Sequence, residues 1–195
     1  MVASSANGFQ NTDPDSCAPS SFGFHPEYLG QRRTGLVDSA DQITVELVLA
    51  ATDDVRILVG ELDRVLSPEY TPEQRHGLTL EQIFKPDIRF FLARQDGAAV
   101  GCGGVAFFTD FAEVKRMYVR DVARGRGVAQ ALLARIEKEA RDAGFAVLKL
   151  ETGMRQIAAL RFYERAGFRQ CAAFGAYATM APEAVATSVF LQKQL

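Results

Sequence analysis

The sequence predicts an α/β protein, of the α+β kind, in which helices flank a central and partly parallel sheet. Short apolar strands and amphipathic helices follow one another in a mixed order, without an internal repeat. Residues 146–150 are almost entirely apolar, which is typical of a strand that is buried on both faces. The 195 residues are 48% hydrophobic and 24% charged, so they can fill one ordinary core, and we expect one domain with an appendage.

The appendage is predicted at residues 1–41. This segment is rich in Ser, Asn, Asp, Gly and Pro and shows no sustained hydrophobic period, so we expect a flexible or loosely docked N-terminal extension. An alternative is an arm that uses Phe22, Phe24 and Tyr28 to cover the active site or a neighbouring subunit. The domain proper is then expected to span residues 42–195.

The first half of this domain is expected to open with a strand and a capped helix. Thr52 is followed by two acidic residues, which is typical of a helix start. The dipeptide Asp96-Gly97 lies between two apolar runs, as in a hairpin turn. The predicted elements are a strand over 43–49, a helix from Thr52 to about 66, a short helix near 79–84, and a hairpin of 88–94 with 99–108.

The second half is expected to alternate strands with two amphipathic helices. Val128, Leu132 and Ile136 form an apolar stripe at helical spacing. Gly144 and Gly167 follow the two helices, where a left-handed residue commonly ends a helix. The predicted elements are a strand over 113–119, a helix from 128 to 144, a strand over 146–150, a helix over 156–166, and short strands near 169–173 and 187–192.

The junction between the strand at 113–119 and the next helix predicts a site for a phosphorylated cofactor. Between Lys115 and Arg126 there are five basic side chains and one acid, Asp121. Glycines let the main chain approach a ligand closely, and the free N–H groups of a helix start attract an anion such as a pyrophosphate. A basic surface turn without a ligand is the alternative. A Rossmann fingerprint fits poorly, because Gln130 takes the place of its third glycine.

Two motifs give the chain a resemblance to a known family. The stretch RGRGVA at 124–129 resembles the (Q/R)-x-x-G-x-(G/A) signature of the GNAT superfamily of acetyl-CoA-dependent N-acetyltransferases, and ALRFYERAGF at 159–168 resembles the second signature of that superfamily. The resemblance covers residues 42–195 and is strongest over 113–169. The motifs ETGMRQ at 151–156 and FGAY at 174–177 are similar to those of bacterial members whose acceptors are mostly unassigned.

The resemblance implies a GNAT-like acyl-CoA N-acyltransferase fold, with a mixed and mostly antiparallel sheet flanked by helices. It implies acetyl-CoA (coenzyme A) as co-substrate, no metal, and direct transfer to an amine in a ternary complex. The pantetheine arm would pair with Met117, Tyr118 and Val119. The pyrophosphate would be bound by Arg124, Gly125, Arg126, Gly127, Val128 and Ala129.

The resemblance also suggests catalytic residues. Tyr163 matches the family's tyrosine that hydrogen-bonds or protonates the departing sulfur, although packing in the core is the structural alternative for a tyrosine beside Phe162. Glu113 is the first candidate for the general base, and a solvated carboxylate at a strand end is the alternative. Glu151 is the second candidate; either glutamate would act directly, through water, or by binding a cationic acceptor. Gln156 would offer its amide to the pantetheine or adenosine side.

The acceptor is open at this level. A primary amine of a small metabolite is our first expectation, because no recognition domain is appended. A protein lysine or N-terminus is an alternative, and a non-catalytic acyl-CoA-binding regulatory module is another. The segments 67–77 and 174–180 are candidate walls of the acceptor pocket, or else ordinary surface connections. Strands near the carboxyl end make a homodimer possible.

Composition argues against several other classes. The formal net charge of −2 is spread without a broad basic surface, so we expect no nucleic-acid partner. No run approaches the 18 apolar residues of a membrane helix, and the first ten residues lack a signal-peptide pattern, so we expect no membrane partner and a cytoplasmic location.

The cysteines and histidines are not expected to carry chemistry. Three cysteines at wide spacing predict reduced thiols without a metal site. Cys102 lies in the run Gly-Cys-Gly-Gly at 101–104, which favours a strand with a close backbone approach over a phosphate loop or a nucleophile. His25 and His76 fall in the extension and in a loop, where we expect solvated roles.

Overall fold

A seven-stranded mixed sheet organises the molecule. The computed structural model describes residues 42–195; the extension predicted for 1–41 lies outside the described residues, as does its candidate arm. The strands stand in the order β1-β2-β3-β4-β5-β7-β6, and only β4 and β5 are parallel neighbours. Their bounds are β1 Ile43–Val48, β2 Ile88–Gln95, β3 Ala98–Phe107, β4 Ala112–Val119, β5 Val147–Gly153, β6 Arg169–Gln170 and β7 Ser188–Gln194.

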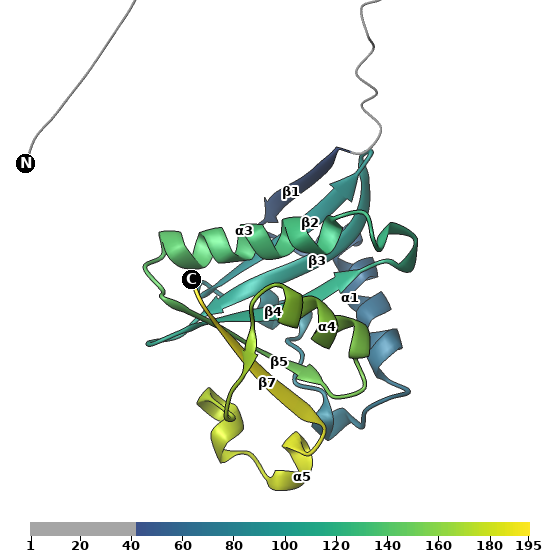
Figure 1. Ribbon diagram of the computed structural model, residues 1–195. Coiled ribbons are helices and arrows are strands. Elements are labelled where there is room, and N and C mark those ends of the chain that lie inside the picture. Colours follow the sequence, from purple (N-terminus) through teal and green to yellow (C-terminus); the bar gives the residue numbers. More distant parts are fainter. Residues whose placement is uncertain (1–41) are drawn as a thin grey trace, which may run out of the picture. The chain divides into compact units, whose positions relative to one another are not determined.

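Helices cover both faces of the sheet (Figure 1). Because side chains alternate along a strand, Phe91 of β2 packs in the core with α3, whereas Phe90 and Leu92 pack in the core with α1 and α2. The side chains of α4 join the core on the α3 face. The helices are α1 Asp53–Leu66, α2 Leu80–Ile83, α3 Val128–Asp142, α4 Ile157–Arg165 and α5 Pro182–Val185, with 3-10 turns η1 Pro72–Gln74, η2 Asp121–Ala123 and η3 Gly175–Thr179.

The order and type of the main predicted elements are confirmed. Differences lie near the carboxyl end, where β5 runs three residues past residue 150 and β6 is only two residues long. The polar end of β5 is a strand because β7 pairs with it through Gly153. The short η3 and α5 were missed, since neither is long enough to show a hydrophobic period.

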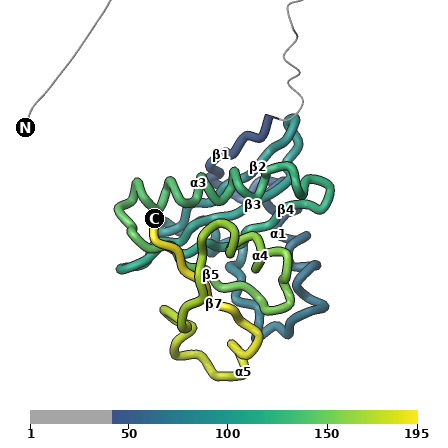
Figure 2. The backbone as a smooth tube through the Cα atoms, viewed as in Figure 1, coloured from purple at the N-terminus to yellow at the C-terminus, as the bar shows by residue number. Residues whose placement is uncertain are grey.

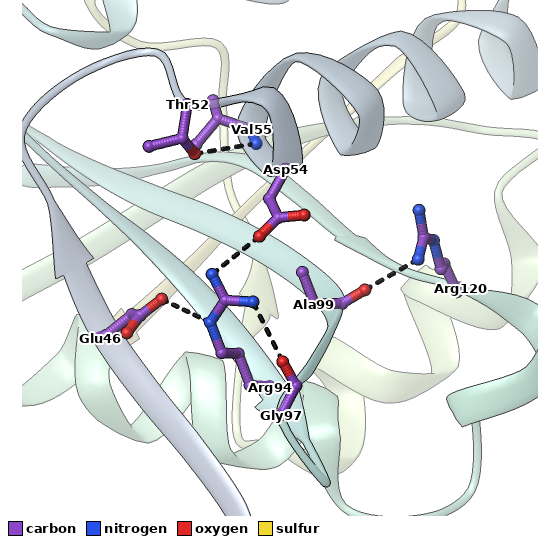
Figure 3. Close-up of polar contacts among 8 residues, drawn as sticks. All are labelled: Glu46, Thr52, Asp54, Val55, Arg94, Gly97, Ala99 and Arg120. Atoms are coloured by element: carbon purple, nitrogen blue, oxygen red, sulfur yellow. Dashed lines mark hydrogen bonds and ion pairs between the residues drawn. The ribbon is translucent and has the colours of Figure 1, made fainter.

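Arg94 connects the first strand, the first helix and the hairpin turn (Figure 3). Its guanidinium lies 2.7 Å from Glu46 and 2.8 Å from Asp54, and it donates to the carbonyl of Gly97 at 3.2 Å. The hydroxyl of Thr52 caps the helix, as the sequence predicts. Solvent-exposed ion pairs of this kind contribute at most about 1 kcal/mol each to the free energy of unfolding. Their main effect is therefore to fix the relative positions of β1, α1 and the hairpin turn.

The glycines of β3 allow neighbouring backbone to approach closely. A Cβ at Gly104 would lie 2.8 Å from the carbonyl oxygen of Arg89 and 2.8 Å from the ring of Phe90. A Cβ at Gly101 would lie 2.8 Å from the carbonyl oxygen of Tyr118. The run 101–104 is therefore part of a strand, which confirms that interpretation over a phosphate loop.

We expect Gly104→Ala to lower the free energy of unfolding by about 1–3 kcal/mol, because the added methyl group meets fixed backbone in a packed core. Gly60→Ala is the matched control. Gly60 lies inside α1 with no atom nearer than 3.9 Å to an added Cβ, so alanine should stabilise that helix by about 0.5–1 kcal/mol. Urea unfolding followed by circular dichroism measures both, and a Gly104→Ala midpoint equal to that of the parent protein would contradict the packing argument.

Candidate active site

The site begins where β4 and β5 part. The two strands pair only through Ala112–Val114 and Leu148–Leu150. Beyond these pairs, β4 remains paired with β3, whereas β5 remains paired with β7. Figures 1 and 2 show α4 beside the place where β4 and β5 diverge. Among the described residues, the edge of β4 that faces β5 has no strand partner after Val114. The backbone groups of Met117–Val119 on that edge can therefore pair with an extended ligand.

A bulge at Arg116 bends β4 at this point. The pairing register with β3 shifts between Cys102 and Gly104, and Arg116 takes a left-handed conformation with φ of 55°. Such a residue costs about 1–3 kcal/mol, so its surroundings must hold it. The guanidinium is ion-paired with Asp63 of α1 and donates to the carbonyl of Leu78 at 2.7 Å. Gly77 leaves room for it, since a Cβ there would lie 2.7 Å from the guanidinium carbon.

The glycine turn leads from β4 into α3. Gly125 and Gly127 have φ of 76° and 88°, and α3 begins at Val128. The first intrahelical bond runs from Ala131 N to the carbonyl of Gly127, so the preceding N–H groups of this helix start have no helical partner. Left-handed glycines followed by free amides make a concave anion site, and these residues fit the predicted pyrophosphate.

The arginines near this turn differ in their ion-pair partners. Arg120 makes a bidentate pair with Glu61 at 2.9 and 2.8 Å and donates to the carbonyl of Ala99, which fixes the exit of β4. Its hydrogen bonds hold the pKa of Glu61 below the usual range. Arg124 pairs with Asp121 at 2.8 Å in an exposed position. Arg126 has no ion-pair partner within residues 42–195, so its charge is available to a ligand.

One cavity brings together five of the residues that the sequence singled out. They are Glu113, Met117, Glu151, Gln156 and Tyr163. The cavity lies between β4, β5, α1 and α4, and the segment 74–77 also lines it. Tyr118, Val119 and the glycine turn at 124–129 are not part of its lining.

Tyr163 is packed in the core and also faces the cavity. Its side chain is 6% exposed and packs edge-on against Phe162 and Phe168, yet it lines the cavity. The hydroxyl donates to the sulfur of Met117 at 3.5 Å. Burial raises the pKa of Tyr163 well above its usual value, so the phenol keeps its proton and remains a hydrogen-bond donor.

Glu113 belongs to a buried polar cluster. The residue is only 2% exposed, so the alternative of a solvated carboxylate is wrong. Its Oε1 lies 2.6 Å from Lys115 Nζ and accepts from the Tyr177 hydroxyl at 2.9 Å, while Lys115 also donates to that hydroxyl at 2.8 Å. Burial and the neighbouring carboxylates raise the pKa of Tyr177 far above its usual value.

Glu151 has a different environment. It is largely buried near the end of β5, and its Oε1 accepts from Ser188 Oγ at 2.6 Å. It has no ion-pair partner in the described part of the chain. Burial raises the pKa of Glu151 above its usual range, although the Ser188 hydrogen bond and the charges of His76 and Lys115 act in the opposite direction. A cavity-facing carboxylate of raised pKa is a candidate for proton transfer.

Three side chains of the loop between α1 and α2 complete the site. The solvated role expected for His76 is wrong, because its Nε2 lies 3.1 Å from the carbonyl of Ala184 and its ring packs edge-on against Tyr177. Tyr70 and Arg75 were missed, since this loop has no periodic pattern. Tyr70 accepts from Arg155 N at 2.9 Å and lies so close to Gly153 that a Cβ there would be 2.2 Å from its hydroxyl.

Both segments predicted as pocket walls line cavities. Residues 74–77 line the first cavity, and residues 174–177 with Met180 line a neighbouring one that also touches Glu113 and Lys115. Cys102 is fully buried, and burial raises the pKa of its thiol to about 12, as suits a thiol that is not a nucleophile. In residues 42–195 no three His, Cys, Asp or Glu side chains are grouped to hold a metal.

Comparison with known proteins assigns the family. The model of the acetyltransferase (GNAT) family matches residues 59–168. The chain belongs to the GNAT acetyltransferase family. An "IAA acetyltransferase" from Azospirillum brasilense is 42% identical over 155 residues, which cover 78% of this chain and 98% of that protein. An aminoalkylphosphonate N-acetyltransferase from Salmonella typhimurium is 27% identical over 133 residues, covering 64% and 85%.

Solved structures confirm the GNAT acyl-CoA N-acyltransferase fold. The crystal structure of an acyl-CoA N-acyltransferase from Klebsiella pneumoniae is 29% identical, with a TM-score of 0.61, and covers 81% of this chain and 99% of that one. The PaiA N-acetyltransferase of Thermoplasma acidophilum, solved with coenzyme A, is 17% identical with a TM-score of 0.59, covering 78% and 99%. Within residues 42–195, none of the helices of this GNAT enzyme has the length and apolar character that crossing a bilayer demands.

We expect Glu113→Gln to lower the free energy of unfolding by about 3–5 kcal/mol, because it leaves Lys115 as a buried charge without an acid. The double variant Glu113→Gln/Lys115→Met should regain most of this loss. Asp142→Asn is the matched control, since it breaks the exposed Lys138–Asp142 pair and should change stability by less than about 1 kcal/mol. Chemical unfolding measures all three variants. A Glu113→Gln protein as stable as the control would show that the cluster is not structural.

Proposed function

We propose that the enzyme moves an acetyl group from acetyl-CoA to the primary amine of a small metabolite by direct transfer in a ternary complex. One observation carries this proposal: the free edge of β4, the Tyr163 hydroxyl and the Glu151 carboxylate border the same cavity. The relative named for aminoalkylphosphonates supports a small amine as acceptor. Direct transfer fits a cavity in which a thioester and an amine can meet, with Cys102 too deeply buried to carry an acyl group.

The cofactor half of the proposal rests on the backbone. Met117, Tyr118 and Val119 would pair with the pantetheine arm along the open edge of β4. The turn of Arg124, Gly125, Arg126, Gly127, Val128 and Ala129 would hold the pyrophosphate by its amides, with charge from Arg126. Gln156, at the start of α4, lines the cavity and would direct its amide to the pantetheine. Bound in this way, acetyl-CoA supplies an activated thioester next to Tyr163.

The reaction needs a neutral amine, and Glu151 is placed to provide it. An alkyl ammonium has a pKa of about 10, so it must lose a proton before its nitrogen attacks the thioester carbonyl. Glu151 takes this proton, the carbon–nitrogen bond forms, and the carbon–sulfur bond breaks. The electron pair leaves on sulfur, where the Tyr163 hydroxyl stabilises the thiolate by a hydrogen bond or transfers a proton to it. In this proposal Glu113 holds Lys115 and Tyr177 in place.

The proposal is tested by thiol release from acetyl-CoA with a panel of small primary amines and one lysine peptide. We expect turnover with small amines and intersecting lines when both substrates are varied, which is the pattern of a ternary complex. Tyr163→Phe should lower kcat about 10- to 100-fold with little change in the KM for acetyl-CoA, as the loss of one charge-assisted hydrogen bond of about 1.5–3 kcal/mol would do.

Other outcomes would identify the alternatives. Turnover of the peptide alone would make the enzyme a protein acetyltransferase. Tight binding of coenzyme A without turnover of any amine would make it a regulatory module that binds acyl-CoA. Parallel lines would replace direct transfer by a covalent acyl-enzyme. Thermal unfolding of Tyr163→Phe serves as control, because its contact with Met117 is weak and the melting temperature should change little.

The pH profile tests the base. Since burial raises the pKa of Glu151, and the base must be ionised to accept a proton, kcat/KM should rise with pH as Glu151 loses its proton above the usual carboxylate range. Glu151→Gln should lower kcat about 100- to 10,000-fold and remove this limb. Ser188→Ala should shift the limb to higher pH, because the lost hydrogen bond favours the ionised form. Glu164→Gln, on the exposed side of α4, is the control and should keep the parent profile.

A further inference from the structure

The charged side chains of the cavity do not all neutralise one another. Lys115 is paired with Glu113, and Arg116 is paired with Asp63. Arg75 and Glu151 also line the cavity, but neither has an ion-pair partner within residues 42–195. Their side-chain hydrogen bonds go to neutral hydroxyls, of Ser67 at 2.8 Å and Ser188 at 2.6 Å. The cavity thus presents one free cation and one free carboxylate.

Arg75 is held by one end of its guanidinium. Its NH1 donates to Ser67 Oγ, which in turn donates to the carbonyl of Asp63 at 2.6 Å, so the group is anchored to the end of α1. Its Nε is buried and has no hydrogen-bond partner. Among the described residues, no other buried side-chain nitrogen or oxygen lacks one. An unpaired buried donor costs about 1–3 kcal/mol, so the protein alone does not satisfy this guanidinium, and the residue also lines the cavity. The planar fork of arginine suits the two oxygens of a carboxylate or phosphonate.

Glu151 reaches the cavity from another element. Arg75 follows η1 in the loop between α1 and α2, whereas Glu151 lies on β5, and the two side chains do not form an ion pair with each other. Separate charges of opposite sign on two walls of one cavity are complementary to a ligand that carries both charges. A neutral or purely cationic amine would leave the Arg75 donor unpaired.

We propose that the acceptor is a small zwitterionic amine, whose carboxylate or phosphonate is bound by Arg75 and whose ammonium group is received by Glu151. This inference rests on the proposed function, because it names the class of acceptor for the same transfer. Binding of the ammonium next to Glu151 favours the ionised carboxylate, and the proton then passes to it as the amine attacks. Arg75 binds the substrate and takes no part in proton transfer.

The test compares matched acceptors at equal concentrations of the free neutral amine. One pair is an amino acid and its amide, and the other is an aminoalkylphosphonate and the corresponding alkylamine. We expect the better zwitterion to exceed its counterpart without the anionic group at least tenfold in kcat/KM, as one charge-assisted contact allows. In Arg75→Gln this preference should fall to within about threefold, through a higher acceptor KM, while the KM for acetyl-CoA stays unchanged. The more affected pair distinguishes carboxylate from phosphonate.

Arg64→Gln is the matched control. Arg64 lies in the last turn of α1 and is exposed outside the cavity, so the variant should keep the preference of the parent enzyme. Ser67→Ala removes the hydroxyl that anchors Arg75 and should weaken the preference in the same direction, but less than Arg75→Gln does.

A binding measurement separates this inference from the proposed function. The same four ligands are titrated by calorimetry into the enzyme saturated with coenzyme A. Binding of a zwitterion that Arg75→Gln weakens at least tenfold supports the inference even if no amine is acetylated, in which case only the proposed function fails. Equal binding and turnover of the partners that lack the anionic group overturns the inference and leaves acetyl transfer intact. A higher KM for acetyl-CoA in Arg75→Gln also overturns it, because Arg75 would then contact the cofactor.

Discussion

The parting of β4 from β5 is the constraint on which the rest of the site depends. Two parallel strands that paired along their full length would close both the backbone edge and the cavity beside it. They part because β4 is bent at Arg116, a left-handed residue whose cost of about 1–3 kcal/mol must be offset by its surroundings. Asp63 and the carbonyl of Leu78 hold its guanidinium, and Gly77 leaves the space that it occupies. The first helix thus stabilises the bend that opens the site.

Glu113 and Glu151 have the same side chain but different partners in the structure. Glu113 and Glu151 lie on the two strands that part; Glu113 is buried, and Glu151 is partly exposed. Glu113 is charge-balanced by Lys115 and hydrogen-bonded by Tyr177, both at its Oε1. Glu151 has only the Ser188 hydroxyl, and burial raises its pKa. The two glutamates therefore have unequal surroundings, and the proposed proton transfer involves the one without an ion-pair partner.

Sequence patterns predicted the fold well because they are local. The apolar stripe of α3 and the Asp96-Gly97 turn each need only a few neighbouring residues, and the motif at 124–129 marks a helix start with left-handed glycines. The partners within the site could not be predicted in this way. Tyr177 lies 64 residues from Glu113 along the chain, so the burial of that carboxylate depends on tertiary packing. Arg75 lies in a loop without periodicity; the catalytic and cofactor roles themselves remain predictions.

The loop that carries Arg75 is irregular, yet tertiary contacts hold it. Tyr70 packs on Gly153 and accepts from a backbone amide beyond the end of β5, and His76 contacts the carbonyl of Ala184 near the carboxyl end. Arg75 itself is anchored through Ser67. Ordering a free loop on ligand binding would cost about 1–2 kcal/mol of conformational entropy per residue. Because these contacts already order the loop in the folded protein, ligand binding does not incur this cost. A loop without regular structure can therefore hold an acceptor-binding residue in place as firmly as a helix does. The sequence of such a loop can change without altering β4, β5 and the glycine turn, which form the proposed cofactor site.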